Sequence, residues 1–324
     1  IIDEAQNIKN AKSLNSKCVK SIHSDYKIAL TGTPIENSLS ELWSLFDFCN
    51  PGYLGDYKEF RTEYEIPVMN GFPEASMMLR RKTGPFIIRR MKSEVLNELP
   101  EKIENTMLVN MTEEQGKLYH SFRALAKRHA QSILSSDEKN KSMEILTLLL
   151  RLRQICCHPS VFDNAYKYGS GKLDLLSEIT ENAVSGGHRI LIFSQFTSML
   201  EIIQKTLSEK NISCFYLDGQ TPPHERTKYA ERFNGGEKSV FLISLKAGGT
   251  GLNLTGADMV IHYDPWWNPA VTDQASDRAY RIGQKKSVQI IKLASKNTIE
   301  EKILSLQEQK RAIADDIIRS DSLS

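Results

Sequence analysis

The second half of the chain carries short runs of apolar, mostly β-branched residues, and these runs constrain the fold more than any other feature. They lie at residues 190–193, 214–217, 240–243, 259–261 and 288–291. Because the runs lack the polar alternation of a half-exposed strand, they are typical of strands that are covered on both faces. Helical patterns separate several of them, as at 199–207 and 225–233. The sequence therefore predicts an α/β fold with a parallel sheet flanked by helices.

The first half of the chain is different, because helical patterns dominate it. The apolar spacing over 39–46 predicts a helix, which Pro51-Gly52 should end. A second amphipathic helix is expected over 143–157, and one strand at 106–109. We therefore expect a mostly helical region before the parallel sheet begins.

Size and composition are those of an ordinary globular protein. The 324 residues favour two domains, and 42 Lys and Arg against 40 Asp and Glu leave a formal charge of +2. Contact with nucleic acid would therefore need local basic patches. The 5 cysteines favour a reducing compartment over a disulfide scaffold, and no apolar run reaches the length of a membrane helix, so we expect no membrane partner. Since the first residue is Ile1, we expect a fragment of a longer protein.

Asp3 and Glu4 follow what looks like the end of a buried strand, and a similar run at 28–30 precedes Thr31-Gly32-Thr33-Pro34. An Asp at the carboxyl edge of a parallel sheet can hold Mg²⁺, while a neighbouring carboxylate orients or deprotonates a water molecule. Nucleotide hydrolases use this layout. The pair also fits an N-cap, and on two residues alone the N-cap is the better interpretation.

The segment 273–281, DQASDRAYR, is a second candidate site. If it is helical, Gln274, Arg278 and Arg281 lie on one face. Two guanidinium groups aimed together suit a polyphosphate, because their paired donors match phosphate oxygens. A solvated face with an Asp277–Arg281 pair explains the spacing equally well. Spacing alone leaves both interpretations open.

Glycines follow the predicted strand at 240–243, in the segment Lys246-Ala247-Gly248-Gly249-Thr250-Gly251. They let the backbone approach a ligand closely, phosphate above all, although a tight structural turn explains them almost as well. Trp266 and Trp267 follow another predicted strand. Core packing is the default for tryptophan, and support or stacking for nucleic acid is the alternative.

Two other patterns are rejected as functional sites. Residues 169–172, GSGK, lack the spacing of a phosphate-binding loop, and Leu173 stands where Ser or Thr is required. Cys156-Cys157-His158 has no second pair of ligands at metal-binding spacing. It reads as the buried end of a helix that Pro159 stops.

Taken together, the motifs resemble the Swi/Snf-type ATPases, double-stranded-DNA translocases of helicase superfamily two. The resemblance covers essentially the whole chain, in the family's order. Its segments are 3–6 (DEAQ, motif II), 30–37 (LTGTPIEN, motif III), 189–196 (RILIFSQF, motif IV), 216–221 (YLDGQT), 246–254 (motif V), 274–284 (QASDRAYRIGQ, motif VI) and the stretch 151–159, RLRQICCHP. Gln6 stands where most members carry His, and Glu36 stands where Gln is commoner.

The resemblance implies two RecA-like lobes, each a parallel sheet flanked by helices, with helical insertions and with ATP held between the lobes. Residues 1–112 would be the C-terminal half of the first lobe with its insertion, 113–165 a helical insertion, 166–297 the second lobe and 298–324 a brace helix. Thr298 and Glu301 form a predicted capping box for that helix. The first lobe would then be incomplete and lack its phosphate loop, so we expect the chain alone to hold ATP poorly.

The resemblance also implies roles for individual residues. Asp3 would bind Mg²⁺ through water, Glu4 would activate the attacking water, and Arg278 and Arg281 would be arginine fingers on the γ-phosphate of ATP. The other implied roles are nucleotide binding for Gln6, Gly251 and Gln274, coupling of hydrolysis to lobe movement for Thr31 and Thr33, and contact with the DNA backbone for Ser194, Thr221, Lys246 and Trp267.

These assignments predict an ATP-driven translocase that contacts double-stranded DNA through its backbone, independently of sequence, and remodels complexes of DNA with a bound protein. Two other functions stay open. One is a strand-separating helicase of the same superfamily. The other is a non-catalytic module that binds DNA or a partner, if the natural chain lacks the phosphate loop. From composition and the resemblance to bacterial members, we expect a cytoplasmic, nucleoid-associated protein.

Overall fold

The computed structural model describes residues 1–36, 38–90, 96, 99–135, 141–247 and 251–318. The chain divides into two compact units. The first comprises Ile1–Leu96, Asn268–Ala270 and Leu306–Ser324, and the second comprises Asn97–Trp267 and Val271–Ser305. Among the described residues, no helix combines the length and hydrophobicity that crossing a lipid bilayer requires.

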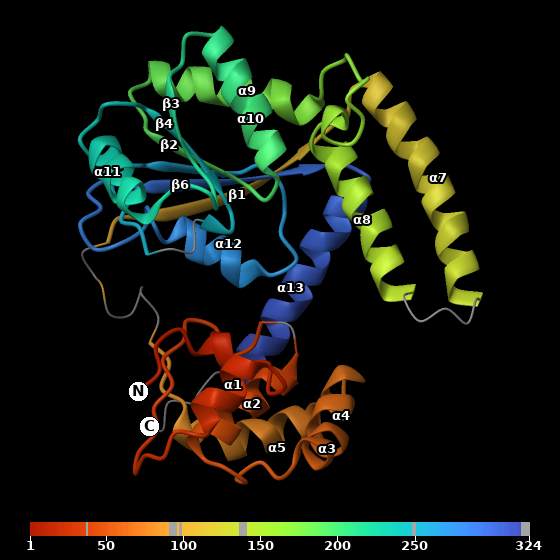
Figure 1. The fold of residues 1–324 in the computed structure, drawn as a ribbon, viewed down its shortest axis with the longest axis vertical. Helices are drawn as coiled ribbons and strands as arrows, with labels where there is room; N and C mark the ends of the chain where they lie inside the picture. The colour runs from red at the N-terminus through yellow and green to blue at the C-terminus, as the bar shows by residue number, and fades with distance from the viewer. Residues whose placement is uncertain (37, 91–95, 97–98, 136–140, 248–250, 319–324) are drawn as a thin grey trace. The chain divides into compact units, whose positions relative to one another are not determined.

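A parallel sheet forms the centre of the second unit (Figure 1). Its strands, six within the described residues, follow the order β1-β6-β5-β2-β4-β3. All pairs are parallel. Their bounds are β1 (Lys102–Val109), β2 (Ile190–Ser194), β3 (Cys214–Leu217), β4 (Val240–Ser244), β5 (Met259–His262) and β6 (Val288–Ser295). Each residue of β2, β4 and β5 is buried, as their lack of polar alternation predicts. The predicted α/β fold with a parallel sheet is confirmed.

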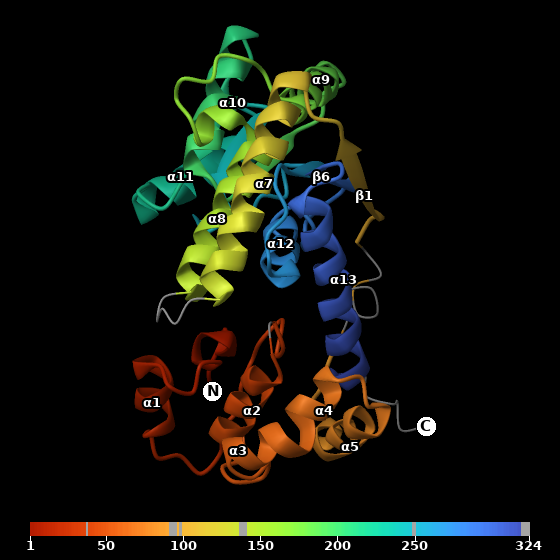
Figure 2. The same cartoon turned by 90° about the vertical axis from the view of Figure 1, so that its right-hand side faces the viewer.

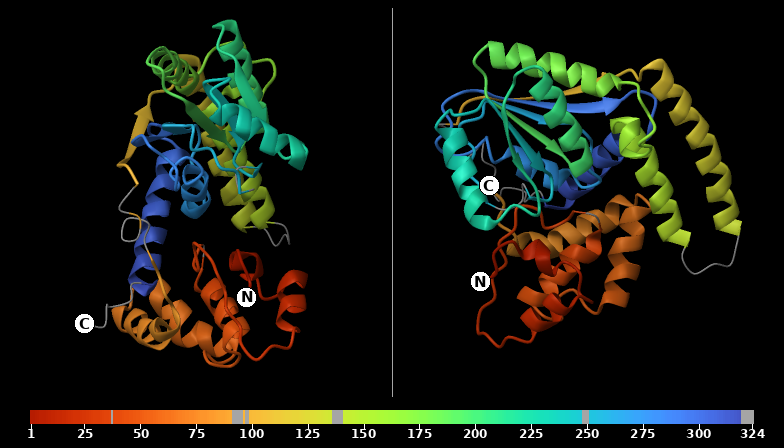
Figure 3. Two further views of the ribbon diagram at one scale, coloured as in Figure 1. Left: turned by 90° about the vertical axis from the view of Figure 1, so that its left-hand side faces the viewer. Right: turned by 45° about the horizontal axis from the view of Figure 1, so that its top comes forward.

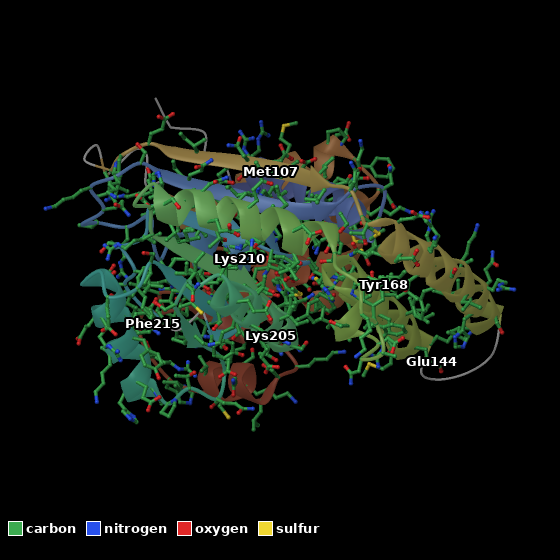
Figure 4. The ribbon with its side chains drawn as sticks, turned by 90° about the horizontal axis from the view of Figure 1, so that it is seen from above. Met107, Glu144, Tyr168, Lys205, Lys210 and Phe215 are labelled. Atoms are coloured by element: carbon green, nitrogen blue, oxygen red, sulfur yellow. The ribbon has the colours of Figure 1, made fainter. Side chains whose placement is uncertain are left out.

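Helices cover both faces of this sheet. On one face, α9 (Gly171–Ser185) and α10 (Thr197–Glu209) pack against the strands through residues such as Leu176 and Ile203. On the other face, α11 (Pro223–Asn234) and α12 (Pro269–Ser276) contribute Phe233 and Ala275. Figure 4 looks onto the side of α9 and α10, where Lys205 and Lys210 are exposed. The helices predicted over 199–207 and 225–233 are confirmed.

Two long helices, α7 (Glu113–Ser135) and α8 (Lys141–Cys157), pack side by side and extend beyond the sheet (Figures 2 and 3). Tyr119 and Ala126 of α7 share a core with Leu152 and Ile155 of α8. A short helix, η4 (Pro159–Val161), follows α8. The amphipathic helix predicted over 143–157 is therefore confirmed.

The strand predicted at 106–109 is confirmed as part of the longer β1. It pairs with β6 from Lys102↔Val288 to Val109↔Ser295 and so belongs to the second unit. The domain boundary predicted at residue 112 places this strand in the N-terminal part instead. The sequence of a single strand does not reveal a parallel partner that is distant along the chain. The division into lobes, insertions and brace helix stays a prediction.

A buried ion pair joins α9 to the start of α13 (Ile299–Ile318). The Nζ of Lys172 lies 2.8 and 2.9 Å from the carboxylate oxygens of Glu300, and the two side chains are 1% and 0% exposed. Burial alone would lower the pKa of Lys172, but the buried carboxylate of Glu300 raises it, and the net effect is a pKa above the ordinary value. The amine therefore stays charged.

The surroundings of this pair explain two sequence features. A Cβ at Gly171 would lie 2.0 Å from the carbonyl oxygen of Asn110, so the rejected GSGK segment needs its glycine for packing. The hydroxyl of Thr298 accepts the amide of Glu300 (3.1 Å), as an N-cap does. The predicted capping box used the carboxylate of Glu301. In the structure it is Glu300 whose carboxylate folds back and accepts the amide of Ser295 (2.7 Å).

The first unit is mostly helical. Its elements are η1 (Ala5–Ile8), α1 (Leu14–Lys20), α2 (Leu39–Cys49), α3 (Tyr57–Phe60), η2 (Arg61–Glu65), α4 (Ile66–Met69), α5 (Pro73–Thr83) and η3 (Gly84–Phe86). The helix predicted over 39–46 is confirmed, and it ends before Pro51 as expected. The prediction of two buried strands, at 1–4 and 28–30, is wrong. The two runs meet only in a parallel bridge between Ile2 and Ala29, because no further strand among the described residues pairs with either run.

Candidate functional site

Asp3 and Glu4 lie in the first unit, immediately after the bridge at Ile2, and both side chains are exposed. The backbone of Glu4 is left-handed, with φ 50° and ψ 49°. Asparagine tolerates such a backbone conformation, whereas glutamate is strained in it. Backbone strain of this kind is found preferentially at functional sites. Glu4 precedes η1 but makes no side-chain capping bond to that helix, which weakens the N-cap interpretation.

A chain of hydrogen bonds leads from Glu4 to the threonines at 31 and 33. The amide of Gln6 donates to Glu4 Oε2 (2.5 Å), and its carbonyl oxygen accepts from the hydroxyl of Thr31 (2.8 Å). The Thr31 hydroxyl also accepts the backbone amide of Thr33 (3.1 Å). Both polar groups of the Gln6 side chain therefore form hydrogen bonds, and Gln6 links the segment of Glu4 to the segment of Thr31.

The chain continues into an ion cluster that the sequence did not predict. The hydroxyl of Thr33 donates to Glu36 (3.3 Å), whose carboxylate pairs with Lys9. Lys9 also lies 3.5 Å from Glu41, whose other oxygen accepts the amide of Glu36 (2.6 Å). Burial lowers the pKa of Lys9, but the carboxylates of Glu36 and Glu41 raise it by more than burial lowers it. The net shift of the pKa is therefore upward. Both departures from the family pattern, Gln6 and Glu36, lie in this one network.

The donor set at Asp3 fits a magnesium ion held through water. Its carboxylate is exposed and accepts the amide of Glu4 at 2.8 Å. Mg²⁺ commonly keeps several waters and takes one or two carboxylates. Within the described residues, no group of three or more His, Cys, Asp or Glu could hold a metal directly.

Cys156 and Cys157 are fully buried, and burial raises the pKa of both thiols, so they stay neutral.

Gln274, Arg278 and Arg281 belong to the second unit, but they do not share one helical face. Helix α12 ends at Ser276, so only Gln274 is helical. The amide of Arg278 bonds to Ala275, three residues back (3.2 Å), and its carbonyl accepts the amide of Leu254 (3.0 Å). The helix stops because the backbone turns to bond the segment after β4. Arg278 is half-buried and Arg281 is exposed.

The segment after β4 carries Lys246 and Gly251. Lys246 is exposed. Gly251 has φ +68°, a backbone conformation that favours glycine whatever the space around it. Gly248, Gly249 and Thr250 of the same motif lie outside the described residues, as does Asn37 of the earlier TGTPIEN segment.

Ser194, at the end of β2, is buried rather than accessible. Its hydroxyl donates to Asp264 (2.5 Å) and accepts the amide of Phe196 (3.2 Å). Direct contact of this side chain with DNA stays a prediction, which a buried and already bonded hydroxyl does not favour. Burial raises the pKa of Asp264, and the nearby cation Arg153 opposes that rise.

Thr221 is half-buried in the turn that follows β3. Its hydroxyl accepts the amide of Asp218 (3.1 Å), and its carbonyl accepts from Arg226 (2.7 Å), which fixes the turn. The residue borders a pocket of about 520 Å³ beside the edge strand β3. This turn offers a backbone and a hydroxyl at the surface of the second unit.

Trp267 is half-buried, and it lies against a buried arginine that sequence reasoning did not single out by role. The guanidinium of Arg153, on α8, lies 5.5 Å from the ring centroid of Trp267 and 5.6 Å from that of Trp266. The only sequence signal was its place in the RLRQICCHP stretch. Gln284 was also missed: its buried amide donates to the carbonyls of Ala257 (2.7 Å) and Ala279 (3.1 Å), holding the end of motif VI.

Comparison with known proteins agrees with this arrangement. A profile of the SNF2-related domain matches residues 1–161, and one of the helicase conserved C-terminal domain matches residues 171–283. The chain is 41% identical over 314 residues to an uncharacterized ATP-dependent helicase of Mycoplasma pneumoniae. It is 40% identical over 333 residues to the putative ATP-dependent helicase/translocase YwqA of Bacillus subtilis. These matches cover 97% and 99% of this chain but 30% and 36% of those proteins, so the chain spans about a third of their length.

A solved structure extends the likeness to three dimensions. The Sulfolobus solfataricus SWI2/SNF2 ATPase core in complex with dsDNA is 40% identical, with a TM-score of 0.58, and the match covers 99% of this chain and 68% of that one. The order of the motifs, the parallel sheet and this coverage agree. The chain therefore belongs to the Swi/Snf family of ATPases.

Proposed function

We propose that the full-length protein containing this chain is a DNA-dependent ATPase that moves along double-stranded DNA and remodels complexes of DNA with bound proteins. The observation that carries the proposal is the hydrogen-bond chain from Glu4 through Gln6 to Thr31 and Thr33. It joins the proposed hydrolytic carboxylate to the segment proposed to respond to the nucleotide. The relatives named above as ATP-dependent helicases, and the solved core in complex with dsDNA, support it.

In this proposal the two units contribute different groups to ATP hydrolysis. Asp3 would hold Mg²⁺ through water, and the ion would supply positive charge to offset charge on the phosphate oxygens. Glu4 would orient and deprotonate the attacking water. Arg278 and Arg281 would donate to the γ-phosphate, while Gly251 and Gln274 would bind nearby parts of the nucleotide.

Hydrolysis would couple to movement through the Gln6 network. Loss of the γ-phosphate changes what Glu4 and the arginines bind, so nucleotide state biases an opening and closing of the lobes. Gln6 would pass the change at Glu4 to Thr31 and Thr33 through the hydrogen bonds described above. The chain would supply half of one nucleotide-binding lobe and the whole of the other. The brace helix expected over 298–324 would be α13, and residues 319–324 lie outside the described part of the chain.

Contact with DNA would be made through the phosphate backbone by Thr221, Lys246 and Trp267. Hydroxyl and ammonium groups bind phosphates without reading bases, so binding should be independent of sequence and sensitive to salt. Ser194 would act indirectly, because its hydroxyl holds Asp264. The protein would work on chromosomal DNA, in association with the nucleoid.

ATP turnover of the natural full-length protein tests the proposal. It is measured without nucleic acid, with single-stranded DNA and with double-stranded DNA. Strong stimulation by duplex supports a duplex translocase. Preference for single strands favours the strand-separating helicase instead, and no turnover under any condition favours the non-catalytic module.

The arginine assignment has its own test. Arg281→Ala should nearly abolish turnover and spare DNA binding. Arg232→Ala is the matched control, since Arg232 is also exposed but pairs with Glu237 on the surface (Nε to Oε2, 2.6 Å). Wild-type turnover in Arg281→Ala would reject the finger.

A further inference from the structure

We propose that Arg153 is a positioning residue that presents Trp267 to DNA. The inference rests on the proposed function, in which Trp267 contacts the duplex. Arg153 lies on α8, and its side chain reaches the segments that follow β2 and β5. It therefore contacts the segment after β5, which carries Trp267, although it is itself 2% exposed and does not reach the surface.

The guanidinium holds both of these segments at once. Its Nη1 donates to the side chain of Gln195, after β2 (2.9 Å). Its Nη2 donates to the carbonyl of Pro265, after β5 (2.5 Å), and lies 3.7 Å from the carboxylate of Asp264. A planar fork holds its donors in fixed directions relative to one another and so bonds the two loops in one geometry, whereas the donors of a lysine ammonium rotate about a flexible stem.

Aromatic rings surround the same guanidinium. Its central carbon lies 5.5 Å from the ring centroid of Trp267, 5.6 Å from that of Trp266 and 5.7 Å from that of Phe196. These distances are those of cation–π contacts. Since the hydrogen bonds fix the plane of Arg153, the contacts in turn fix the orientation of Trp267, whose ring is half-buried and so offers part of its surface outward.

Core packing alone explains this arrangement poorly. A buried ion pair adds little stability over apolar residues of the same volume. Arg153 also leaves its Nε, and Gln195 its Nε2, without a hydrogen-bond partner among the described atoms, a fault that an apolar residue would avoid. What the arginine adds is orientation of the loops and of the indole ring, and that is the property a DNA contact needs.

Arg153→Lys tests the inference in the natural full-length protein, because it keeps the charge and removes the planar fork. The readouts are the duplex concentration at half-maximal ATPase stimulation and the ¹⁹F resonance of 5-fluorotryptophan at position 267, assigned with Trp267→Phe. We expect the resonance of the free protein to shift or broaden. The half-saturating duplex concentration should rise about 10-fold, which corresponds to about 1.4 kcal/mol and lies between an exposed and a desolvated cation–π contact.

Arg151→Lys is the matched control. Arg151 is two residues away on α8 and also lies over a ring, that of Phe162 at 5.6 Å, but it is exposed. This variant should leave the Trp267 resonance unchanged and the half-saturating concentration within about 2-fold. Thermal unfolding of each variant verifies that it is folded.

A folded Arg153→Lys with a wild-type Trp267 resonance and wild-type half-saturation would overturn the inference. If Arg153→Lys does not fold, Phe196→Leu replaces it, since it removes one ring from the cluster and should change both readouts in the same direction; unchanged readouts in that variant also overturn the inference. Failure of the proposed function is a separate result: duplex DNA would neither stimulate the wild-type protein nor shift its Trp267 resonance.

Discussion

Replacing Lys172 by Met should leave the carboxylate of Glu300 buried without its cation. In the wild type the pair is 1% and 0% exposed, and the other hydrogen bond described for this carboxylate comes from the amide of Ser295 (2.7 Å). Breaking a buried ion pair on one side typically costs about 3–5 kcal/mol, because the remaining charge is uncompensated.

The same loss follows from proton binding. A buried Glu300 can avoid the unpaired charge by taking up a proton, and for a glutamate with an unfolded-chain pKa of about 4.3 this requires about 3.7 kcal/mol at pH 7. The folded variant would then hold a proton that the unfolded chain releases. Its deficit relative to the wild type should therefore shrink as the pH falls, by about 1.4 kcal/mol per pH unit between 7 and 5.

The wild-type pair should not share this pH dependence. The pKa of Lys172 is raised above its ordinary value, so its contribution is complete below the unfolded-chain pKa and is lost only in strongly alkaline solution. The comparison between variant and wild type at pH 5, 6 and 7 therefore isolates the carboxylate.

Urea unfolding at these three pH values measures the effect in the wild type, Lys172→Met, Glu300→Gln and the double variant. The double variant should be more stable than Lys172→Met at pH 7, since it buries no charge. Lys210→Met is the control: its ion pair with Glu181 is exposed, and the variant should resemble the wild type throughout (Figure 4). A loss in Lys172→Met below about 1 kcal/mol, or one that stays constant from pH 7 to 5, would refute the reasoning.

Three further predictions concern packing, pH and coupling. Gly171→Ala should destabilise the protein by at least about 2 kcal/mol because its Cβ would meet a backbone oxygen at 2.0 Å, whereas Gly219→Ala, in open space, should be within about 0.5 kcal/mol of wild type; equal melting temperatures would contradict this. Burial lowers the pKa of His262 to about 3, so protonation of the unfolded chain should remove about 2 kcal/mol of stability between pH 6.5 and 5; His262→Gln should lose less in urea unfolding, and an equal loss would reject the assignment. Lys9→Met and Glu36→Gln should be non-additive by about 1 kcal/mol in a double-mutant cycle of stability, and additive effects would show that the pair is not coupled.

The sheet of the second unit was predictable from the sequence because its strands are buried on both faces. Such strands are apolar at each position, and the runs at 190–193 and 240–243 coincide with β2 and β4 within one residue. The same rule failed at 28–30. That run is as apolar as the others, but it has no neighbours on both sides among the described residues and forms only a bridge. A strand depends on its partners, which local sequence does not reveal.

The candidate site was predictable in residue type but less so in geometry. Spacing put Arg278 and Arg281 on one helical face, yet the helix ends at Ser276 because the backbone bonds to Leu254, more than twenty residues earlier. The hydroxyl of Ser194 is likewise taken by Asp264, seventy residues later. Contacts between distant segments decide both cases, so no local pattern could have shown them.

The pairing of β1 with β6 has a consequence for how the protein folds. The partners lie about 190 residues apart, and a ribosome adds about 5–20 residues per second, so β1 is made roughly 10–40 s before β6. In that interval Ile103, Met107 and Leu108 have no strand to adjoin. Parallel strands with such distant partners fold slowly and are exposed to aggregation. The sheet can therefore be completed only when most of the chain has left the ribosome, and the first strand synthesised is among the last to be fixed in place.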